Sequence, residues 1–162
     1  MRAVGGTCRG CRRRCLSRCD DGVMTEIPAA GSIQVSTIIG GSVVRVSADA
    51  TVADVAAAIV GNEVGAVVVG DDPRPEALVT ERDVARVVAS GQDPSSVPAA
   101  DVASKKLIWC DADDTVARVA TRMMDRYIRH VLVERDGTLV GIVSARDLLG
   151  VYAADADASA LG

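Results

Sequence analysis

Aromatic residues are nearly absent from this 162-residue sequence: they make up 2% of it, with one Trp, two Tyr and no Phe. Proteins that bind single-stranded nucleic acid commonly stack bases on exposed aromatic rings, so specific nucleic-acid binding is not expected. Hydrophobic residues still make up 49% of the chain, and the core must therefore be built from Val, Ile, Leu and Ala. A chain of this length can bury such a core but is short for two independent domains.

Patterns typical of catalysis and of membrane insertion are also missing. His130 is the only histidine, which leaves room for one Ser-His-Asp or Cys-His arrangement at most. The sequence has neither a Walker lysine motif nor G-x-G-x-x-G. No apolar run approaches the roughly 18 residues of a membrane span, and residues 1–22 lack the apolar centre of a signal peptide. We therefore expect a cytoplasmic protein that is neither an enzyme nor bound to a membrane.

Cysteine is scarce outside the N-terminal segment, which holds four of the five: Cys8, Cys11, Cys15 and Cys19. The spacing C-x2-C-x3-C-x3-C could ligate zinc or an iron–sulfur cluster, because such sites favour thiolate ligands. Common structural zinc sites, however, pair two well-separated C-x2-C knuckles, and these four cysteines fit that arrangement poorly. Six Arg against two Asp also give residues 1–23 a net charge of +4, which leaves −8 on the remainder of a chain whose total is −4.

Three further interpretations of this segment stay open. In the first, it is a basic tail that contacts polyanions weakly. In the second, translation starts at Met24 and the segment upstream is not part of the protein. In the third, the cysteines are free thiols in a reducing compartment. We expect residues 1–32 to be a disordered Cys- and Arg-rich tail and lead-in without a metal site. The alternative function is a metal- or redox-responsive protein, in which these cysteines sense and the rest of the chain is a scaffold.

An internal repeat organises the rest of the chain. Residues 33–83 can be laid over residues 97–147 without a gap, at a constant offset of 64 residues. Polar as well as apolar residues coincide: Ala48-Asp49 with Ala112-Asp113, Thr51-Val52-Ala53 with Thr115-Val116-Ala117, and Arg82-Asp83 with Arg146-Asp147. Chance apolar similarity would not keep register through these polar positions, so the chain contains a duplication.

Each copy has the periodicity of a strand, a helix, two strands and a second helix. In the first copy, a β-rich run at 42–46 precedes an apolar stripe over 51–62 with the i, i+3, i+4, i+7 spacing of a one-faced helix. Apolar runs at 65–70 and 76–80 predict a pair of strands, and 83–90 predicts a helix. The second copy predicts helices at 115–126 and 146–152 and strands at 130–134 and 138–143, with an Asp136-Gly137 hairpin turn.

This pattern predicts an α/β (α+β) fold made of two β-α-β-β-α units. The units span residues 33–91 and 97–152, a linker occupies 92–96, and residues 153–162 are expected to form a disordered tail. Cys110 falls on Val46 in the repeat, so we expect a small buried side chain there. Trp109 falls on Arg45, which favours a position facing outward or into an interface.

The most informative points are the strand-to-helix junctions at Thr80 to Asp83 and at Ser144 to Asp147. A hydroxyl residue three positions before Asp is often only a capping box, which stabilises a helix start by about 1 kcal/mol. Here the pattern occurs at equivalent places in both units, with an Arg kept before each Asp. A helix N-terminus and a guanidinium favour phosphate, whereas a carboxylate suits the two hydroxyls of ribose. The junctions therefore predict a nucleotide site.

The duplicated unit and the ending from Gly141 to Asp147 resemble cystathionine-β-synthase-type (CBS) domains, a pair of which forms a Bateman module. The resemblance covers residues 33–152. It implies two units packed by their sheets with pseudo-two-fold symmetry, around two clefts that bind adenosine-containing ligands such as AMP, ADP, ATP or S-adenosylmethionine. It also implies a stand-alone regulatory sensor with no required cofactor, which forms a homodimer and acts on a separate effector protein.

The same resemblance assigns roles to individual residues. It implies that ribose is bound by Asp83 and Asp147, and that phosphate is bound by Thr80, Arg82, Ser144 and Arg146. It implies a base pocket lined by Gly65, Ala66, Val67, Arg129, His130 and Val131. The small apolar pair Gly65-Ala66 stands opposite the polar pair Arg129-His130 in the repeat, so the two clefts are expected to differ. A purely structural interaction protein, with empty clefts and simple helix caps, is the remaining alternative.

Overall fold

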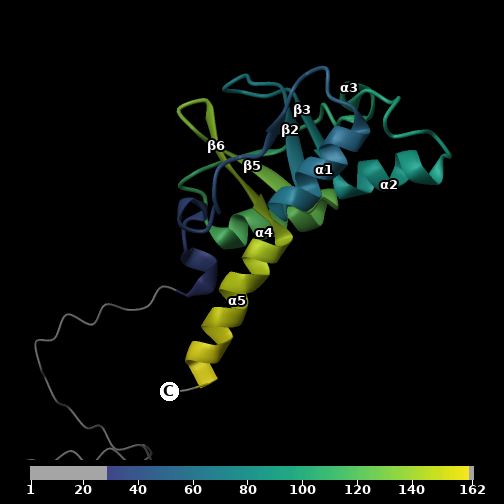
Figure 1. The fold of residues 1–162 in the computed structure, drawn as a ribbon. Helices are drawn as coiled ribbons and strands as arrows, with labels where there is room; N and C mark the ends of the chain where they lie inside the picture. The colour runs from purple at the N-terminus through teal and green to yellow at the C-terminus, as the bar shows by residue number, and fades with distance from the viewer. Residues whose placement is uncertain (1–28, 161–162) are drawn as a thin grey trace, which may run out of the picture.

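The structure, a computed structural model, describes residues 29–160, which form a duplicated fold of strands and helices (Figure 1). The first unit contains β1 (Arg45–Val46), α1 (Val52–Asn62), β2 (Ala66–Val69), β3 (Ala77–Thr80) and α2 (Glu81–Ala89). The second contains β4 (Trp109–Asp111), α4 (Val116–Arg126), β5 (His130–Arg135), β6 (Thr138–Ser144) and α5 (Ala145–Ala160). Short helices precede each unit: η1 (Ala30–Ser32) and η2 (Val35–Thr37) the first, and α3 (Ala99–Val102) the second.

The strands form two three-stranded sheets with the same topology. The strand orders are β1-β2-β3 and β4-β5-β6, and in each sheet the first pair is parallel and the second antiparallel. Val67 pairs with Val79 in one sheet, and Val131 pairs with Val143 in the other. These partners differ by the repeat offset of 64 residues, so the predicted mixed fold and its order of elements are confirmed.

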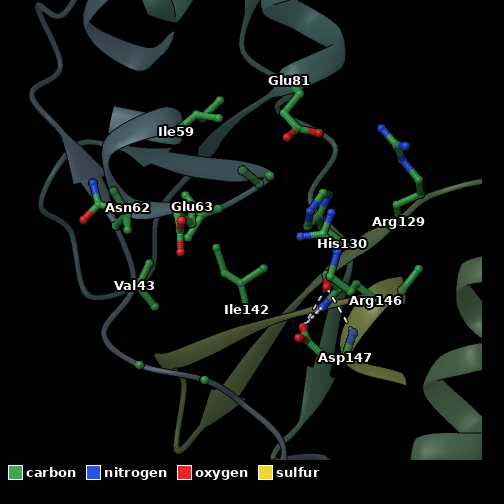
Figure 2. A pocket seen from close by; sticks show the side chains of 18 of the residues that line it. Val43, Ile59, Asn62, Glu63, Glu81, Arg129, His130, Ile142, Arg146 and Asp147 are labelled. Atoms are coloured by element: carbon green, nitrogen blue, oxygen red, sulfur yellow. Dashed lines mark hydrogen bonds between the residues drawn. The ribbon is translucent and has the colours of Figure 1, made fainter. Parts of the chain in front are cut away.

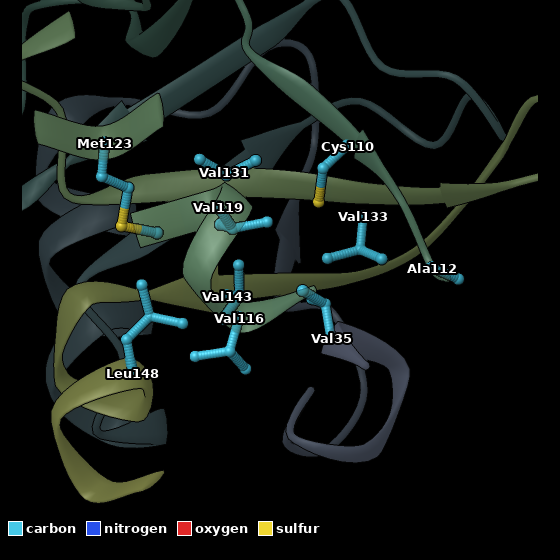
Figure 3. Close-up of a cluster of buried hydrophobic side chains, with 10 residues drawn as sticks. All are labelled: Val35, Cys110, Ala112, Val116, Val119, Met123, Val131, Val133, Val143 and Leu148. Atoms are coloured by element: carbon cyan, nitrogen blue, oxygen red, sulfur yellow. The ribbon is translucent and has the colours of Figure 1, made fainter. Parts of the chain in front are cut away.

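The two sheets pack against each other through one face and against helices through the other. Because side chains alternate along a strand, Val68 and Leu132 enter a cluster that contains residues of both sheets. Their neighbours Val67 and Val131 point to the helix side, into separate clusters that are each built mainly from one unit. Figure 3 shows the larger of these clusters, in which Cys110 is buried as expected.

The segments that precede the two units are exchanged between them. Val35 is fully buried in the core of the second unit, where its backbone N–H donates to Asp114 at 2.9 Å. In the same way Ala99 is buried in the core of the first unit and donates its N–H to Ala50 at 2.8 Å. Each unit is therefore completed by the lead-in of the other, which the sequence boundaries 33–91 and 97–152 do not convey.

Two expectations about the ends of the fold are wrong. The final helix does not end at Tyr152: α5 continues to Ala160 and projects from the body (Figure 1), because its added residues are rich in Ala, the strongest helix former. The lead-in is also not irregular up to residue 32, since η1 packs on α4 and α5 and Ala30 is buried. Within residues 29–160, no helix has both the length and the apolar character that crossing a membrane requires.

Candidate functional site

A cavity of about 1110 Å³ lies between the two units, where β2 begins and β6 runs into α5 (Figure 2). Its volume is at the upper end of the roughly 300–1,000 Å³ usual for ligand sites. The first unit contributes the apolar pair Val43 and Val44, and the second contributes Ile142. Polar and charged side chains supply the rest of the chemistry: Asn62, Glu63, Glu81, Arg129, His130, Ser144, Arg146 and Asp147.

The junction at Asp147 combines a helix cap with a carboxylate oxygen that is available to a ligand. Asp147 Oδ2 accepts from the backbone N–H of Ser144 and from Ser144 Oγ, both at 2.7 Å. The backbone N–H of Asp147 donates back to Ser144 Oγ at 3.3 Å. Asp147 Oδ1 accepts no hydrogen bond and forms no salt bridge among residues 29–160. Capping uses one oxygen only, so the cap and ligand-binding interpretations of this motif are compatible.

The equivalent junction at Asp83 is closed by a side chain that the second unit lacks. Asp83 Oδ2 accepts from Thr80 N at 3.0 Å and from Thr80 Oγ1 at 2.7 Å, while Oδ1 accepts from Arg86 Nη1 at 2.8 Å. Both oxygens are thus occupied. The repeat partner of Arg86 is Gly150, which cannot make this contact. Asp83 lies beside a separate pocket of about 250 Å³ rather than the large cavity.

The segments that border the two junctions also differ. Ser104 and Leu78 exchange two backbone hydrogen bonds, at 2.9 and 3.1 Å, which bind Ser104 to the edge of β3. Their repeat partners, Gly40 and Ile142, form no such bridge within the described part of the chain, and both line the cavity. The cleft at Asp147 is therefore open, whereas the corresponding place at Asp83 is bordered by a paired strand edge.

The structure brings together seven of the twelve predicted site residues. The cavity is lined by Gly65, Ala66, Arg129, His130, Ser144, Arg146 and Asp147. Thr80, Arg82 and Asp83 do not line it. Val67 and Val131 do not line it either, because strand alternation turns these fully buried side chains to the helix side.

Sequence reasoning missed part of the apolar wall and two carboxylates. Val43, Val44 and Ile142 occupy apolar repeat positions that could have been assigned to the cleft from their proximity to the junctions. Glu81 is the unassigned residue next to Thr80 in the first motif, and it reaches the cavity of the second motif. Glu63 has φ = 54° and ends α1 in the left-handed conformation, for which the sequence has no clear signal.

His130 lies at the centre of the site, between Glu81 and Asp147 in Figure 2. A Cβ atom at Gly65 would lie 2.8 Å from His130 Nε2, so this glycine allows the close approach of the ring. Burial lowers the pKa of His130, and the neighbouring Arg129 lowers it further, against smaller opposing effects of Glu81 and Asp147. The imidazole is therefore mainly neutral near pH 7.

Cys110 and Trp109 both lie in packed surroundings away from the cavity. Burial raises the pKa of Cys110 to about 11, which keeps the thiol protonated and unreactive. Trp109 is half-buried at the interface of the units, with the Arg74 guanidinium 4.4 Å from its ring centroid; Arg74 also pairs with Glu134. Within residues 29–160 there is no cluster of potential metal ligands, and the four N-terminal cysteines lie outside the described residues.

The model of the CBS domain family matches this chain twice, at residues 35–90 and 99–154. An uncharacterized protein of Methanopyrus kandleri is 32% identical over 123 residues, which cover 74% of this chain and 63% of that protein. The match thus spans less than two thirds of that relative's length.

Two solved structures extend the likeness to three dimensions. A CBS domain protein from Pyrobaculum aerophilum, complexed with AMP, has a TM-score of 0.66 and 34% identity, over 75% of this chain and 99% of that one. A hexameric CBS-CP12 protein from bloom-forming cyanobacteria has a TM-score of 0.67 and 29% identity, over 74% of this chain and 71% of that one. Two family matches at the two structural units cover most of the chain, which therefore belongs to the CBS domain family.

Proposed function

We propose that this chain is a regulatory module that senses an adenosine-containing ligand in the cavity at Asp147. The observation that carries the proposal is the unpartnered Asp147 Oδ1 at the edge of a cavity that also holds Ser144 and Arg146. The AMP complex of the Pyrobaculum aerophilum relative supports the ligand class. The role is binding rather than catalysis, and the effector is a separate protein in the cytoplasm.

Each part of such a ligand has a matching surface in the cavity. Asp147 Oδ1 would accept hydrogen bonds from the ribose hydroxyls. The Arg146 guanidinium and the N-terminus of α5 would hold a phosphate, as helix N-termini and forked donors do elsewhere. The adenine would lie against Val43, Val44 and Ile142, which come from both units. A ligand that contacts both units would stabilise their mutual arrangement, and this coupling is the regulatory signal.

We further propose that each chain has one working site. The Asp83 carboxylate is already satisfied by Thr80 and Arg86. The Arg86 contact is largely solvent-exposed and therefore weak, but a ribose would have to displace it and also open the strand edge held by Ser104. The open cavity at Asp147 needs neither change.

A thermal-shift series on the intact chain tests both statements. Ligand at a hundred times its dissociation constant should add about 2.7 kcal/mol of stability. We expect AMP or another adenosyl compound to raise Tm, Asp147→Asn to abolish the rise, and the matched variant Asp83→Asn to retain it. Absence of any shift with a folded wild-type chain would contradict the proposed function. Loss of the shift in Asp83→Asn alone would move the site to the other junction.

Self-association is also proposed, because exposed apolar residues recur at equivalent places in both units. Val60 and Met124 are repeat partners on α1 and α4, with 77% and 75% of their side chains exposed. The cyanobacterial CBS-CP12 neighbour is hexameric; for this chain we propose a homodimer through these helices. Light scattering should report a dimer for the wild type and a monomer for Met124→Glu. A wild-type monomer at micromolar concentration would contradict this.

A further inference from the structure

The charges that line the cavity are unbalanced towards the negative. Three carboxylates, Glu63, Glu81 and Asp147, face it, against the two guanidiniums of Arg129 and Arg146. His130 adds little positive charge near pH 7, because its pKa is lowered by burial and by Arg129. The lining therefore carries one more negative than positive charge. Charges in a partly enclosed site are screened less by salt than those on open surface, so this balance affects which ligands bind.

The duplication within the chain shows how much positive charge this cavity lacks. Gly41 and Ser42 line it, and their repeat partners 64 residues on are Lys105 and Lys106. Asn62 also lines it, and its repeat partner is Arg126. Three positions that are cationic in the second unit are thus uncharged in the first unit, whose copies of these positions line the open cavity.

The available cations match the charge of a single phosphate group. A phosphate monoester carries about −1.5 to −2 charge at pH 7, which Arg129 and Arg146 together can neutralise. A second or third phosphate adds negative charge for which the lining offers no further cation. Such a group would also approach the carboxylates of Glu63 or Glu81, and like charges at short range repel.

We propose that the Asp147 cavity selects adenosyl ligands with at most one phosphate group and discriminates against ADP and ATP. The inference rests on the proposed function, since it concerns the ligand of that same cavity. The property that the site distinguishes is the charge of the ligand beyond the first phosphate.

Calorimetric titration of the intact chain with AMP, ADP and ATP tests this inference, in buffer of fixed ionic strength that contains a chelator, because bound Mg²⁺ would mask the extra phosphate charge. We expect affinity to fall from AMP to ATP by about tenfold or more, as an unfavourable contact between close charges would produce. The ratio should shrink in Glu81→Gln. It should stay unchanged in Glu76→Gln, which removes an exposed carboxylate that does not line the cavity.

A gain-of-function variant keeps the test independent of any loss of folding. Ser42→Lys places at the cavity rim the lysine that its repeat partner carries, and it should improve ATP binding about threefold or more relative to AMP. Equal or tighter binding of ATP than of AMP by the wild type would overturn the inference and leave the proposed nucleotide site intact. Failure of all three nucleotides and of S-adenosylmethionine to bind the folded chain would overturn the proposed function itself.

Discussion

At the scale of single residues, Gly65 has no free space for a Cβ atom. A Cβ there would lie 2.8 Å from His130 Nε2 and 3.1 Å from His130 Cε1. The obstacle is the half-buried ring of His130 at the cavity, which must shift to admit the Cβ atom. We expect Gly65→Ala to lower the free energy of unfolding by about 1–3 kcal/mol, as overpacking does, in urea denaturation.

Gly150→Ala is the matched control for this substitution. Gly150 lies inside α5, and a Cβ there meets no atom within 4 Å. Because alanine is the better helix former, this change should raise the free energy of unfolding by about 0.5–1 kcal/mol. Two glycine-to-alanine changes with effects of opposite sign would separate steric conflict from backbone entropy. Equal effects would contradict the close approach of His130 to Gly65.

The lowered pKa of His130 gives the stability of the protein a pH dependence with a defined sign. Burial, and then Arg129, disfavour the imidazolium in the folded state, so the unfolded state binds the proton first as pH falls below about 6.5. The stabilising contribution of the neutral ring is complete above that pH and is lost as pH falls towards the folded pKa.

Urea midpoints measured between pH 7.5 and pH 6 report this contribution. We expect the midpoint to fall as the solution is acidified, and His130→Gln to show a smaller fall because it cannot take up the proton. Carboxylates titrate mainly below this range, so they affect both proteins alike. Identical pH profiles for the two proteins would show that His130 is equally easy to protonate in the folded and unfolded states.

At the scale of elements, the sequence predicted the type of nearly every helix and strand and the last residues of α1 and α4, but not where α5 ends or how the caps of α1 and α4 are formed. The N-cap of α1 is Thr51, as its pattern indicates, and its hydroxyl accepts from the Asp54 N–H. The C-cap residues that follow α1 and α4 are Glu63 and Tyr127, and both are left-handed with φ = 54°. Left-handed caps are usually glycine, so a Glu or a Tyr at the cap does not indicate this conformation from the sequence.

The cap at Tyr127 predicts a stabilising substitution. Its side chain is 90% exposed, so little packing is lost on its removal, while its left-handed backbone costs about 1–2 kcal/mol for a residue with a Cβ. Tyr127→Gly should therefore raise the free energy of unfolding by about 1 kcal/mol. As a control, Asp125→Gly inside α4 should lower it by a few tenths of a kcal/mol or more. A loss of stability in Tyr127→Gly would imply that the exposed ring is packed in an assembly.

At the scale of the whole molecule, the repeat predicted two units and the resemblance to CBS domains implied their sheet-to-sheet packing, but neither indicated what opens one cleft. Within residues 29–160, two differences between the copies accompany the open cavity: Gly40 forms no strand bridge where the other unit has the bridged Ser104, and Gly150 stands where it has Arg86. Each difference is visible in the alignment of the two copies, yet its effect depends on a neighbour in space. Ser104 matters through its bonds to Leu78, and Arg86 through its bond to Asp83.

The exchanged lead-ins make the two units one cooperative structure. Val35 precedes the first unit in sequence but is fully buried in the core of the second (Figure 3). Val35→Ala should lower the free energy of unfolding by about 2 kcal/mol, as removal of two buried methyl groups does. The transition should stay single and coincide when followed by circular dichroism and by the fluorescence of Trp109.

As a control, Val140→Ala, on an exposed position of β6, should lower the free energy of unfolding by less than about 1 kcal/mol. Two separate transitions in Val35→Ala, with the Trp109 signal lost first, would mean that the second unit unfolds alone and that the exchange of lead-ins does not couple the units.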